Sequence, residues 1–555
     1  MLRCPSGSLE IIQRRHEDLS FFCNSSRTEL CLQLSSSIKK IKNYHRLMRK
    51  LAANTMNVND WVAVSRTLHG IVEVSYLAQG CRFEDVTVLQ NILCHVDDNI
   101  FNLRSIFDQL VDLKVSKEKG QVSVKPGVDV QLDEKRRLYN GMSDLLNRVS
   151  SEEKKYMPPG VRNCTAVYLP HIGFLVAVPR ESLENPDMNV LADHGYEYVF
   201  ESATSHHFRT TRTRSVDARF GDVMLEIIKR EAAIITRLTE IILKKRTSLE
   251  AIVTYCAQLD CLISMSQVCR EQNWVKPEMV QAGDLIIRDG RHPLQELAIN
   301  NFIPNDTWMG RKGGRVHVLT GPNSSGKSVY MKQVGLIIYL AHLGCFVPAS
   351  AAKIPIFERI FIRVNTSESV GQGMSSFMSD LNHLTSALTN MQPATLLLVD
   401  EFGKGTAACD GASLLAATIS HLGQLRDKSP LAVFSTHFHQ VPDLAEPSTS
   451  VQFLYMNSQL SPASDLVHYY KLTEGVCSFS HALEVAKKAG IKRSVVERGR
   501  DVLTSLQSGS SISLNSDHQE KMKSITDFMS QFLDLDVDDD DKLTDFLSRI
   551  DNLDC

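Results

Sequence analysis

The sequence lacks the features that mark secreted, zinc-bound or membrane-spanning proteins. Its 13 cysteines include no C-x-x-C pair and no cysteine–histidine spacing of a zinc site, which favours reduced thiols in a reducing compartment. The first residues contain no apolar stretch of signal-peptide length. Residues 334–352 carry no Asp, Glu, Lys or Arg, but they include glycine, histidine and proline. That composition predicts a buried helix followed by a turn rather than a membrane span.

Neither the length nor the charge of the chain identifies a ligand. A chain of 555 residues is too long for one hydrophobic core, so we expect three or four domains. With 43% hydrophobic and 23% charged residues, the composition is that of an ordinary folded protein. The net charge is -3, so any surface that binds nucleic acid must be a local one.

Apolar periodicity changes along the chain and indicates several parts. Helical spacing dominates the first half, whereas β-branched and aromatic residues fill 164–179 and 196–214. Strand and helix alternate further on, as in an α/β nucleotide-binding domain. We therefore expect helices in 1–135, a β-rich insertion with flanking helices in 136–215, returning helices in 216–285, an α/β domain in 286–506 and a flexible Ser-rich and acidic tail in 507–555. A short partner-binding helix at the end of that tail is the alternative.

One stretch fills every fixed position of the phosphate-binding loop G-x-x-x-x-G-K-[ST]. An apolar run from Val316 to Thr320 reads as the strand before it, and Val329 to Leu343 reads as the helix after it. The lysine of such a loop reaches the β- and γ-phosphates, and its serine ligates Mg²⁺. A glycine turn before a core helix is the structural alternative. The expected phosphate-binding residues are Gly321, Pro322, Asn323, Ser324, Ser325, Gly326, Lys327 and Ser328.

Two further apolar strands end in side chains suited to nucleotide hydrolysis. Residues 395–399 are followed by Asp400 and Glu401, the Walker B arrangement, in which Asp400 holds Mg²⁺ and Glu401 polarises the attacking water. Residues 431–435 are followed by Thr436 and His437, where a histidine could sense the γ-phosphate. A hydrogen-bonded core histidine is the alternative for His437.

Two other segments have a functional and a structural interpretation each. Ser375 opens an apolar-periodic helix, where a serine is usually an N-cap but can also form an anion site. The segment 205–214 carries three arginines, two histidines and no acid. Arg209, Arg212 and Arg214 could meet a phosphate backbone, or they could be charges along a solvated strand edge.

In this order, these motifs resemble the MutS family of DNA-binding ATPases, within the ABC-type ATPase group, over roughly residues 30–505. The stretches that carry the resemblance are 320–328, 375–378, 400–406, 410–411 and 435–437. Ser324-Ser325 in the loop, with 332–336 and 379–382, looks most like the meiotic-recombination branch. Members of that branch work as heterodimers, here with the fourth MutS homologue as the expected partner.

The resemblance implies a fold and roles for individual residues. The fold is multidomain: a helical core with long lever helices and a β-rich DNA clamp, followed by an α/β P-loop (ABC-type) ATPase domain with dimerisation elements. ATP and Mg²⁺ would be the cofactors, and Asn323 would also contact the nucleotide. Ser375 would act in trans on the partner's γ-phosphate. Phe302 would pack against adenine, although an apolar anchor at a domain edge is equally compatible.

The implied function is ATP-dependent binding of branched DNA in meiotic recombination. The protein would hold Holliday junctions as a heterodimeric sliding clamp that promotes crossovers, in the nucleus and away from membranes. The sequence has no F-x-E triplet, the mismatch-reading motif of the family, and we expect the N-terminal mismatch-binding domain to be absent. Val329, residues 407–409 and residues 478–482 depart from the family pattern. Mismatch recognition and a non-catalytic ATP-binding subunit are therefore alternatives.

Overall fold

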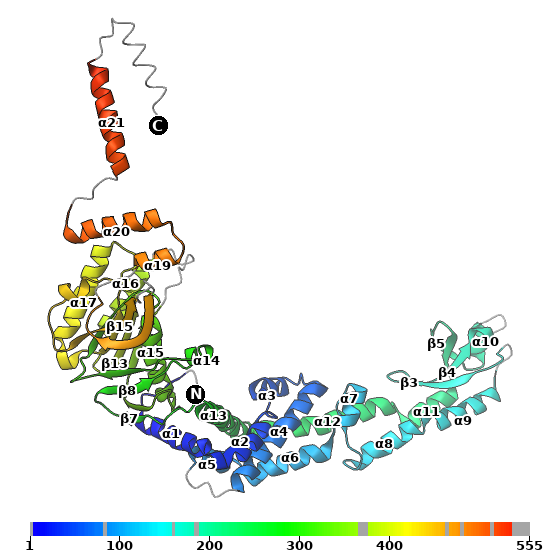
Figure 1. The fold of residues 1–555 in the computed structure, drawn as a ribbon. Coiled ribbons are helices and arrows are strands. Elements are labelled where there is room, and N and C mark those ends of the chain that lie inside the picture. Colours follow the sequence, from blue (N-terminus) through cyan, green and yellow to red (C-terminus); the bar gives the residue numbers. More distant parts are fainter. Residues whose placement is uncertain are drawn as a thin grey trace, which may run out of the picture. The chain divides into compact units, whose positions relative to one another are not determined.

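The chain divides into two compact units, drawn as ribbons in Figure 1. The computed structural model describes residues 4–80, 86–157, 161–182, 188–364, 376–460, 466–477, 482–510 and 516–534. The first unit comprises Met1–Gly290 and Leu336–Ile356, and the second comprises Arg291–Gly335 and Phe357–Cys555. The boundary crosses helix α15 (Lys327–Leu343), which therefore contributes to both units.

A helical core fills the N-terminal part of the first unit. Apolar residues at helical spacing share one buried cluster. A capping box of Asn57 and Asp60 fixes the start of the long α4. The helices of this core are α1 (Leu9–Cys23), α2 (Thr28–Ile38), α3 (Tyr44–Ala52), α4 (Val58–Gln79), α5 (Thr87–His95), α6 (Asp98–Leu110), α7 (Leu113–Lys119) and α13 (Arg246–Glu271).

Among the described helices, α13 is long and apolar enough to cross a membrane by length and composition. Its apolar residues, however, belong to the core cluster, and it packs against α1, α2 and α5. A core helix of a folded protein passes the same test of length and hydropathy. The packing therefore accounts for the apolar character of α13.

Two pairs of helices extend from this core. They are α8 (Val130–Asn140) with α9 (Met142–Lys154), and α11 (Thr211–Phe220) with α12 (Val223–Lys244). The apolar run from Phe220 to Lys245 predicts one helix, but the chain breaks at Gly221, which has φ 65°. Asp222 then caps α12 by accepting from the Leu225 amide.

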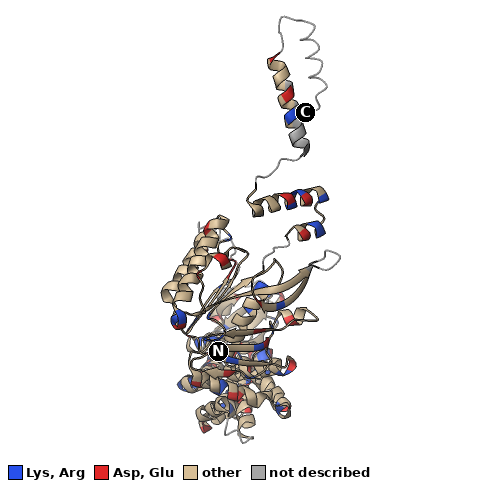
Figure 2. Ribbon diagram, turned by 60° about the vertical axis from the view of Figure 1, so that its left-hand side comes forward, with Lys and Arg blue, Asp and Glu red and all other residues tan. Residues whose placement is uncertain are grey.

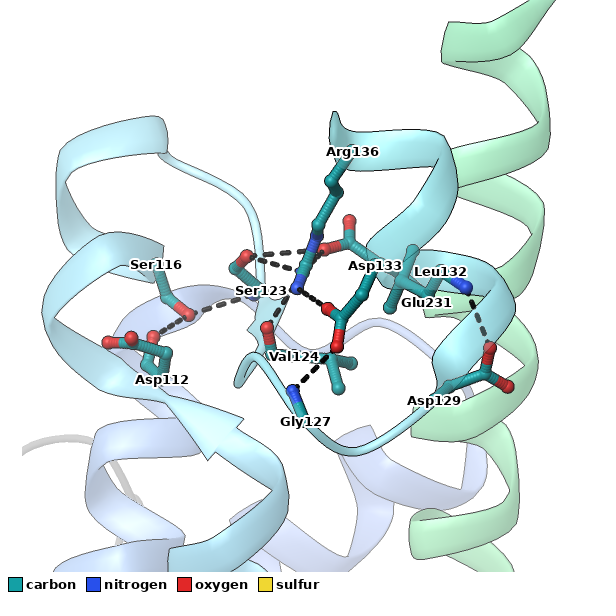
Figure 3. Close-up of polar contacts among 10 residues, drawn as sticks. All are labelled: Asp112, Ser116, Ser123, Val124, Gly127, Asp129, Leu132, Asp133, Arg136 and Glu231. Atoms are coloured by element: carbon teal, nitrogen blue, oxygen red, sulfur yellow. Dashed lines mark hydrogen bonds and ion pairs between the residues drawn. The ribbon is translucent and has the colours of Figure 1, made fainter. Parts of the chain in front are cut away.

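An arginine in the middle of α8 connects this helix with α12 and with a short strand (Figure 3). The Arg136 guanidinium donates 2.7 Å to the carbonyl oxygen of Val124 and pairs with Glu231 of α12. Asp133 lies beside it and accepts 2.7 Å from the Gly127 amide. Three elements, β2 (Ser123–Val124), α8 and α12, are thus held together by the Arg136 guanidinium.

A four-stranded antiparallel sheet lies between α9 and α11 in sequence. Its order is β3-β4-β6-β5, with β3 (Thr165–Leu169), β4 (Gly173–Pro179), β5 (Glu197–Glu201) and β6 (Ser205–Arg209). The short helix α10 (Met188–Asp193) precedes β5. The β-rich stretch expected to run to residue 214 ends at Arg209, so that expectation is wrong for its last part. Thr210 and Thr213 form a capping box that starts α11 instead.

Three short strands complete the first unit. They are β7 (Glu278–Val280), β11 (Ala351–Pro355) and β8 (Leu285–Gly290), and β11 pairs with both others. Residues 334–352 form the buried end of α15 and then a turn into β11, as their composition predicts.

The second unit is built on a six-stranded sheet. Its order is β12-β13-β14-β10-β15-β16, and all neighbours are parallel except the final pair. Parallel strands buried on both faces read as continuous apolar runs, which explains β13 and β14. The strands are β10 (Val316–Thr320), β12 (Arg359–Arg363), β13 (Thr395–Asp400), β14 (Leu431–Ser435), β15 (Val451–Leu460) and β16 (Leu466–Glu474).

Helices α15, α16 (Ser376–Asn390) and α17 (Ala408–Gln424) accompany the sheet. Smaller elements are α14 (Gln295–Ala298), β9 (Asn305–Met309) and α18 (Val441–Leu444). Further along the chain come α19 (Ala482–Lys488) and α20 (Arg493–Ser508). Figure 2 shows acidic and basic residues interspersed on α19 and α20, where Arg493 pairs with Glu497 and Arg500 with Glu484.

The tail expected to be flexible contains a helix, α21 (Ser516–Leu533). Met522, Ile525, Met529 and Phe532 recur at helical spacing without an intervening glycine or proline, and this pattern explains the helix. All four side chains are exposed. The Asp cluster at 536–541 lies outside the described residues.

Candidate nucleotide site

Three strand ends converge at one edge of the six-stranded sheet. β14 runs parallel to both β10 and β13, with Ser435 opposite Leu319 on one side and Asp400 on the other. The carboxyl ends of parallel strands lie at the same edge of a sheet. The glycine loop after β10, the acid pair after β13 and His437 after β14 therefore leave the sheet together. Backbone bonds join them, because the Glu401 amide donates 3.1 Å to Ser435 O and the Thr436 amide donates 3.0 Å to Leu319 O.

The loop between β10 and α15 needs glycine at two points. Gly321 has φ 143° and Gly326 has φ 102°, a region of backbone space that L side chains rarely adopt. A Cβ on Gly321 would also lie 3.1 Å from Ser325 Oγ. Within the loop, Pro322 and Ser325 are buried, whereas Asn323 and Ser324 are exposed.

Lys327 begins α15 and folds over the loop. Its Nζ donates 2.7 Å to Gly321 O and 3.0 Å to Pro322 O. Burial lowers the pKa of this ammonium, while the nearby Glu401 and Asp400 carboxylates oppose that effect. The lysine is thus held at the loop, where a bound anion would stabilise its charged form.

The acid pair after β13 is fixed in two different ways. Asp400 is buried, and it accepts a hydrogen bond from the Ser435 hydroxyl of β14. Glu401 has φ 49°, and its backbone amide donates 3.1 Å to the hydroxyl oxygen of Ser435. Positive φ at a non-glycine residue costs energy and is common where geometry serves function. Ser435 therefore positions both acidic residues.

Burial and neighbouring charges shift the pKa values of Glu401 and His437. Burial raises the pKa of Glu401, but the Lys404 ammonium 3.0 Å away, Lys327 and His437 outweigh it, and the net pKa lies below its usual value. Burial lowers the pKa of His437, and although Glu401 opposes this, the net shift is downward. At neutral pH the structure therefore favours a carboxylate at Glu401 and a neutral imidazole at His437.

Two cavities adjoin the glycine loop, and Asn323, Ser324 and Glu401 line both. The first, about 340 Å³, is mainly apolar, and its lining includes Phe302, Ser328 and Gln333. The second, about 730 Å³, also has a mainly apolar lining, but Lys404, His437 and Lys488 contribute charged or titratable side chains to it. The expected nucleotide residues of the loop and Glu401 thus meet at one place, and the lysines Lys404 and Lys488 line only the second cavity.

The residues of this site fit magnesium-bound ATP. The first amides of α15 have no acceptor within the helix, and a helix N-terminus attracts anions. Ser325 Oγ is buried in the loop without a hydrogen-bond partner. Ser328, at the start of α15, and Asp400, at the end of β13, supply the hydroxyl and carboxylate oxygens that Mg²⁺ prefers.

Sequence reasoning missed four residues around this site: Arg363, Lys404, Ser435 and Gln333. Arg363 ends β12, and its guanidinium pairs with Asp380 of α16 and donates to the carbonyl oxygen of Asp400. The lysine could have been suspected from its place three residues after Glu401. Arg363 and Ser435 contact residues of other elements, and Gln333 lines a cavity formed by several elements, so no local sequence pattern predicts these three.

Ser375 lies outside the described residues, so its expected action in trans stays a prediction. The helix α16 begins at the next residue. Phe377 in its first turn lies with its ring centroid 6.2 Å from that of Phe402, just after the acid pair. The start of α16 is therefore tied to the end of β13 through this ring contact and through Arg363.

The three arginines proposed to face DNA make contacts within the first unit. Arg212 pairs at 3.2 Å with buried Glu153 and lies 3.9 Å above the Tyr156 ring. Arg209 donates 2.8 Å to a backbone carbonyl oxygen, and Arg214 pairs with Glu197. Although residues 205–214 contain no acid, two of their arginines pair with glutamates from other segments. Contact with DNA stays a prediction, and Arg214 is the exposed member of the three.

Models of two domains of one protein family match this chain. The family model of MutS domain III matches residues 1–266, and that of MutS domain V matches residues 317–507. The chain belongs to the MutS family.

Within that family, the chain is similar to MutS protein homolog 5. It is 30% identical to that protein of Caenorhabditis elegans over 91% of this chain and 37% of the relative. It is 28% identical to MutS protein homolog 5 of Saccharomyces cerevisiae over 96% of this chain and 64% of the relative. It is also 27% identical to the DNA mismatch repair protein MutS of Alkaliphilus metalliredigens, over 90% of this chain and 55% of the relative. The chain thus spans between 37% and 64% of the length of these relatives.

Proposed function

We propose that this protein is an ATP-dependent DNA-binding protein of meiotic recombination. It binds branched intermediates such as Holliday junctions, together with a second MutS homologue, as a clamp whose closure depends on ATP. It acts in the nucleus. The observation that carries the proposal is the convergence of the glycine loop, Asp400, Glu401 and His437 at one sheet edge. The similarity to MutS protein homolog 5 supports the meiotic role.

Each residue of the site has a proposed role. Lys327 and the amides at the start of α15 bind the phosphates. Ser328 and Asp400 hold Mg²⁺, which when bound neutralises the charge that develops on the transferred phosphoryl group. Glu401, kept ionised by Lys404, orients and deprotonates the attacking water. His437 lines the cavity of about 730 Å³ together with Glu401 and senses the end of the phosphate chain.

The wider architecture is proposed to convert this chemistry into movement on DNA. The second unit is the P-loop ATPase domain of the ABC type, α8, α9, α11 and α12 are the lever helices, and the four-stranded sheet is the clamp that meets DNA. ATP bound in two composite sites favours one dimer geometry, and hydrolysis releases it. Ser375 completes the partner's site in trans.

The catalytic proposal is tested with Glu401→Gln in this subunit of the purified heterodimer. We expect unchanged ATP affinity and steady-state turnover reduced by roughly a hundredfold at this site, because a general base contributes about 10²–10⁴ in rate. Glu446→Gln, at an exposed position of the same unit, is the matched control. Unchanged turnover in Glu401→Gln would show that this subunit binds ATP without hydrolysing it.

The DNA proposal is tested by equilibrium binding of the heterodimer to a Holliday junction, a plain duplex and a mismatched duplex of equal length. Salt must be fixed, because phosphate contacts make affinity strongly dependent on ionic strength. We expect tighter binding to the junction than to either duplex. A preference for the mismatched duplex, with equal affinity for the junction and the plain duplex, would instead establish mismatch surveillance.

A further inference from the structure

An unpartnered glutamine lies in the wall of the apolar cavity. Gln333 projects from α15, six residues after Lys327, and is only 1% exposed. Neither Nε2 nor Oε1 of its side chain has a hydrogen-bond partner. The residue lines the cavity of about 340 Å³ beside the glycine loop. Both a donor and an acceptor are therefore buried at a cavity wall and left unsatisfied.

Such an arrangement is unusual within a folded protein. The great majority of buried polar side-chain atoms have at least one partner, and an orphaned buried amide destabilises the ligand-free protein. One turn earlier on α15, Tyr330 shows the ordinary outcome, because its buried hydroxyl lies 2.9 Å from Thr307 Oγ1. Packing at this helix therefore does satisfy polar groups. Gln333, which lies on α15 beyond its first turn and lines the cavity, is the exception.

The rest of the cavity wall defines what could satisfy this amide. Phe302, Ile299, Met456 and Tyr470 give the cavity a largely apolar lining that suits a flat ring. The phosphate-loop residues 323–328 form another part of the same wall. The ligand must combine an anionic part for the loop, an apolar body, and an edge that offers a hydrogen-bond donor beside an acceptor.

Adenine has such an edge, since its exocyclic amino group donates and the adjacent ring nitrogen accepts. A glutamine amide matches this pair with two parallel hydrogen bonds. We propose that Gln333 is the residue that selects the base of the bound nucleotide, by pairing its amide with the amino-bearing edge of adenine. This assignment rests on the proposed ATP site and deepens it. Phe302 then makes the apolar contact with the base, and Gln333 discriminates adenine from bases that lack its amino group.

The test compares ATP with purine riboside triphosphate, which lacks only the 6-amino group. Equilibrium binding of both to the full chain is measured by calorimetry in the presence of Mg²⁺, for wild type and Gln333→Leu. We expect wild type to bind ATP at least tenfold more tightly than the analogue, because the analogue leaves Oε1 unpaired. Gln333→Leu should bind both with similar affinity. Lys332→Leu, exposed at the neighbouring position of α15, should keep the wild-type ratio.

A second measurement excludes a purely structural role. Without nucleotide, Gln333→Leu should raise the melting temperature by roughly 2–4 °C, because it removes two unsatisfied polar atoms from a buried site. A glutamine whose amide merely held the fold together would give a lower melting temperature on substitution. The thermal shift and the affinity ratio are independent of catalytic turnover.

The outcomes separate this assignment from the proposed function. Equal wild-type affinity for ATP and the analogue, or a Gln333→Leu variant that keeps the wild-type ratio, overturns base selection by Gln333 while leaving the ATP site intact. Failure of wild type to bind either triphosphate overturns the ATP site and this assignment together. Should Gln333→Leu fail to fold, the wild-type ratio alone decides, because a ratio near one refutes the assignment.

Discussion

Breaking the buried ion pair between Arg363 and Asp380 should loosen the edge of the sheet that carries Asp400. The two side chains are 10% and 1% exposed, and Nε of Arg363 lies 2.7 Å from Asp380 Oδ1. Arg363→Met leaves the Asp380 carboxylate without its guanidinium partner. Removing one partner of a buried pair costs about 3–5 kcal/mol, much more than the pair itself contributes. We therefore expect Arg363→Met to lower the free energy of local opening by about 3–5 kcal/mol.

The double variant Arg363→Met with Asp380→Leu distinguishes a stranded charge from lost packing. Replacing both partners by apolar groups of similar volume is often neutral or stabilising, so the double variant should recover most of the loss. The exposed pair Arg311–Asp427 of the same unit provides the control, because Arg311→Met should change little.

The assay is native-state hydrogen exchange, which reports the free energy of local opening without requiring two-state unfolding of the whole chain. The amides of β13 and β14 should lose protection in Arg363→Met and regain most of it in the double variant. Because Arg363 also donates to the Asp400 carbonyl oxygen, some loss at the end of β13 should persist. Two results would refute the reasoning: an Arg363→Met effect no larger than that of Arg311→Met, or a double variant as unstable as the sum of its parts.

Two more outcomes are expected. Lys404→Met should move the acid limb of ATP turnover to higher pH, because burial raises the pKa of Glu401 and Lys404 is the leading group that opposes it; a pH–rate profile with an unmoved limb would contradict this. Gly411→Ala should lower the free energy of unfolding by about 1–3 kcal/mol, because its Cβ would lie 2.9 Å from Gly403 O and 3.0 Å from Phe438 Cζ. Chemical denaturation checks it, with exposed Ser413→Ala as the control; equal stability of the two variants would count against it.

Local patterns predicted the elements of the nucleotide site well. The strands at 316–320 and 431–435 follow from continuous apolar runs, and the helix after the glycine loop follows from its periodicity. These signals lie within a few residues of one another, so a single sequence suffices to find them. The family matches over 1–266 and 317–507 confirm the resemblance that the motifs carry.

Contacts between distant segments could not be predicted in the same way. Ser435 holds Asp400 across two strands, and Arg363 reaches an aspartate in another element. Residues 205–214 contain no acid, yet folding brings Glu153 and Glu197 to their arginines. The start of α11 was missed because the hydroxyl groups of Thr210 and Thr213 cap a helix where β-branched residues predict a strand.

The central claim is that the glycine loop binds the phosphates of ATP through Lys327. The most direct measurement is calorimetric titration of the full chain with ATP and Mg²⁺, comparing wild type, Lys327→Ala and Lys312→Ala, an exposed lysine of the same unit. The far-ultraviolet circular dichroism of all three should agree. We expect wild type and Lys312→Ala to bind alike and Lys327→Ala to show no measurable binding. Wild-type affinity in a folded Lys327→Ala variant would contradict the assignment of the site.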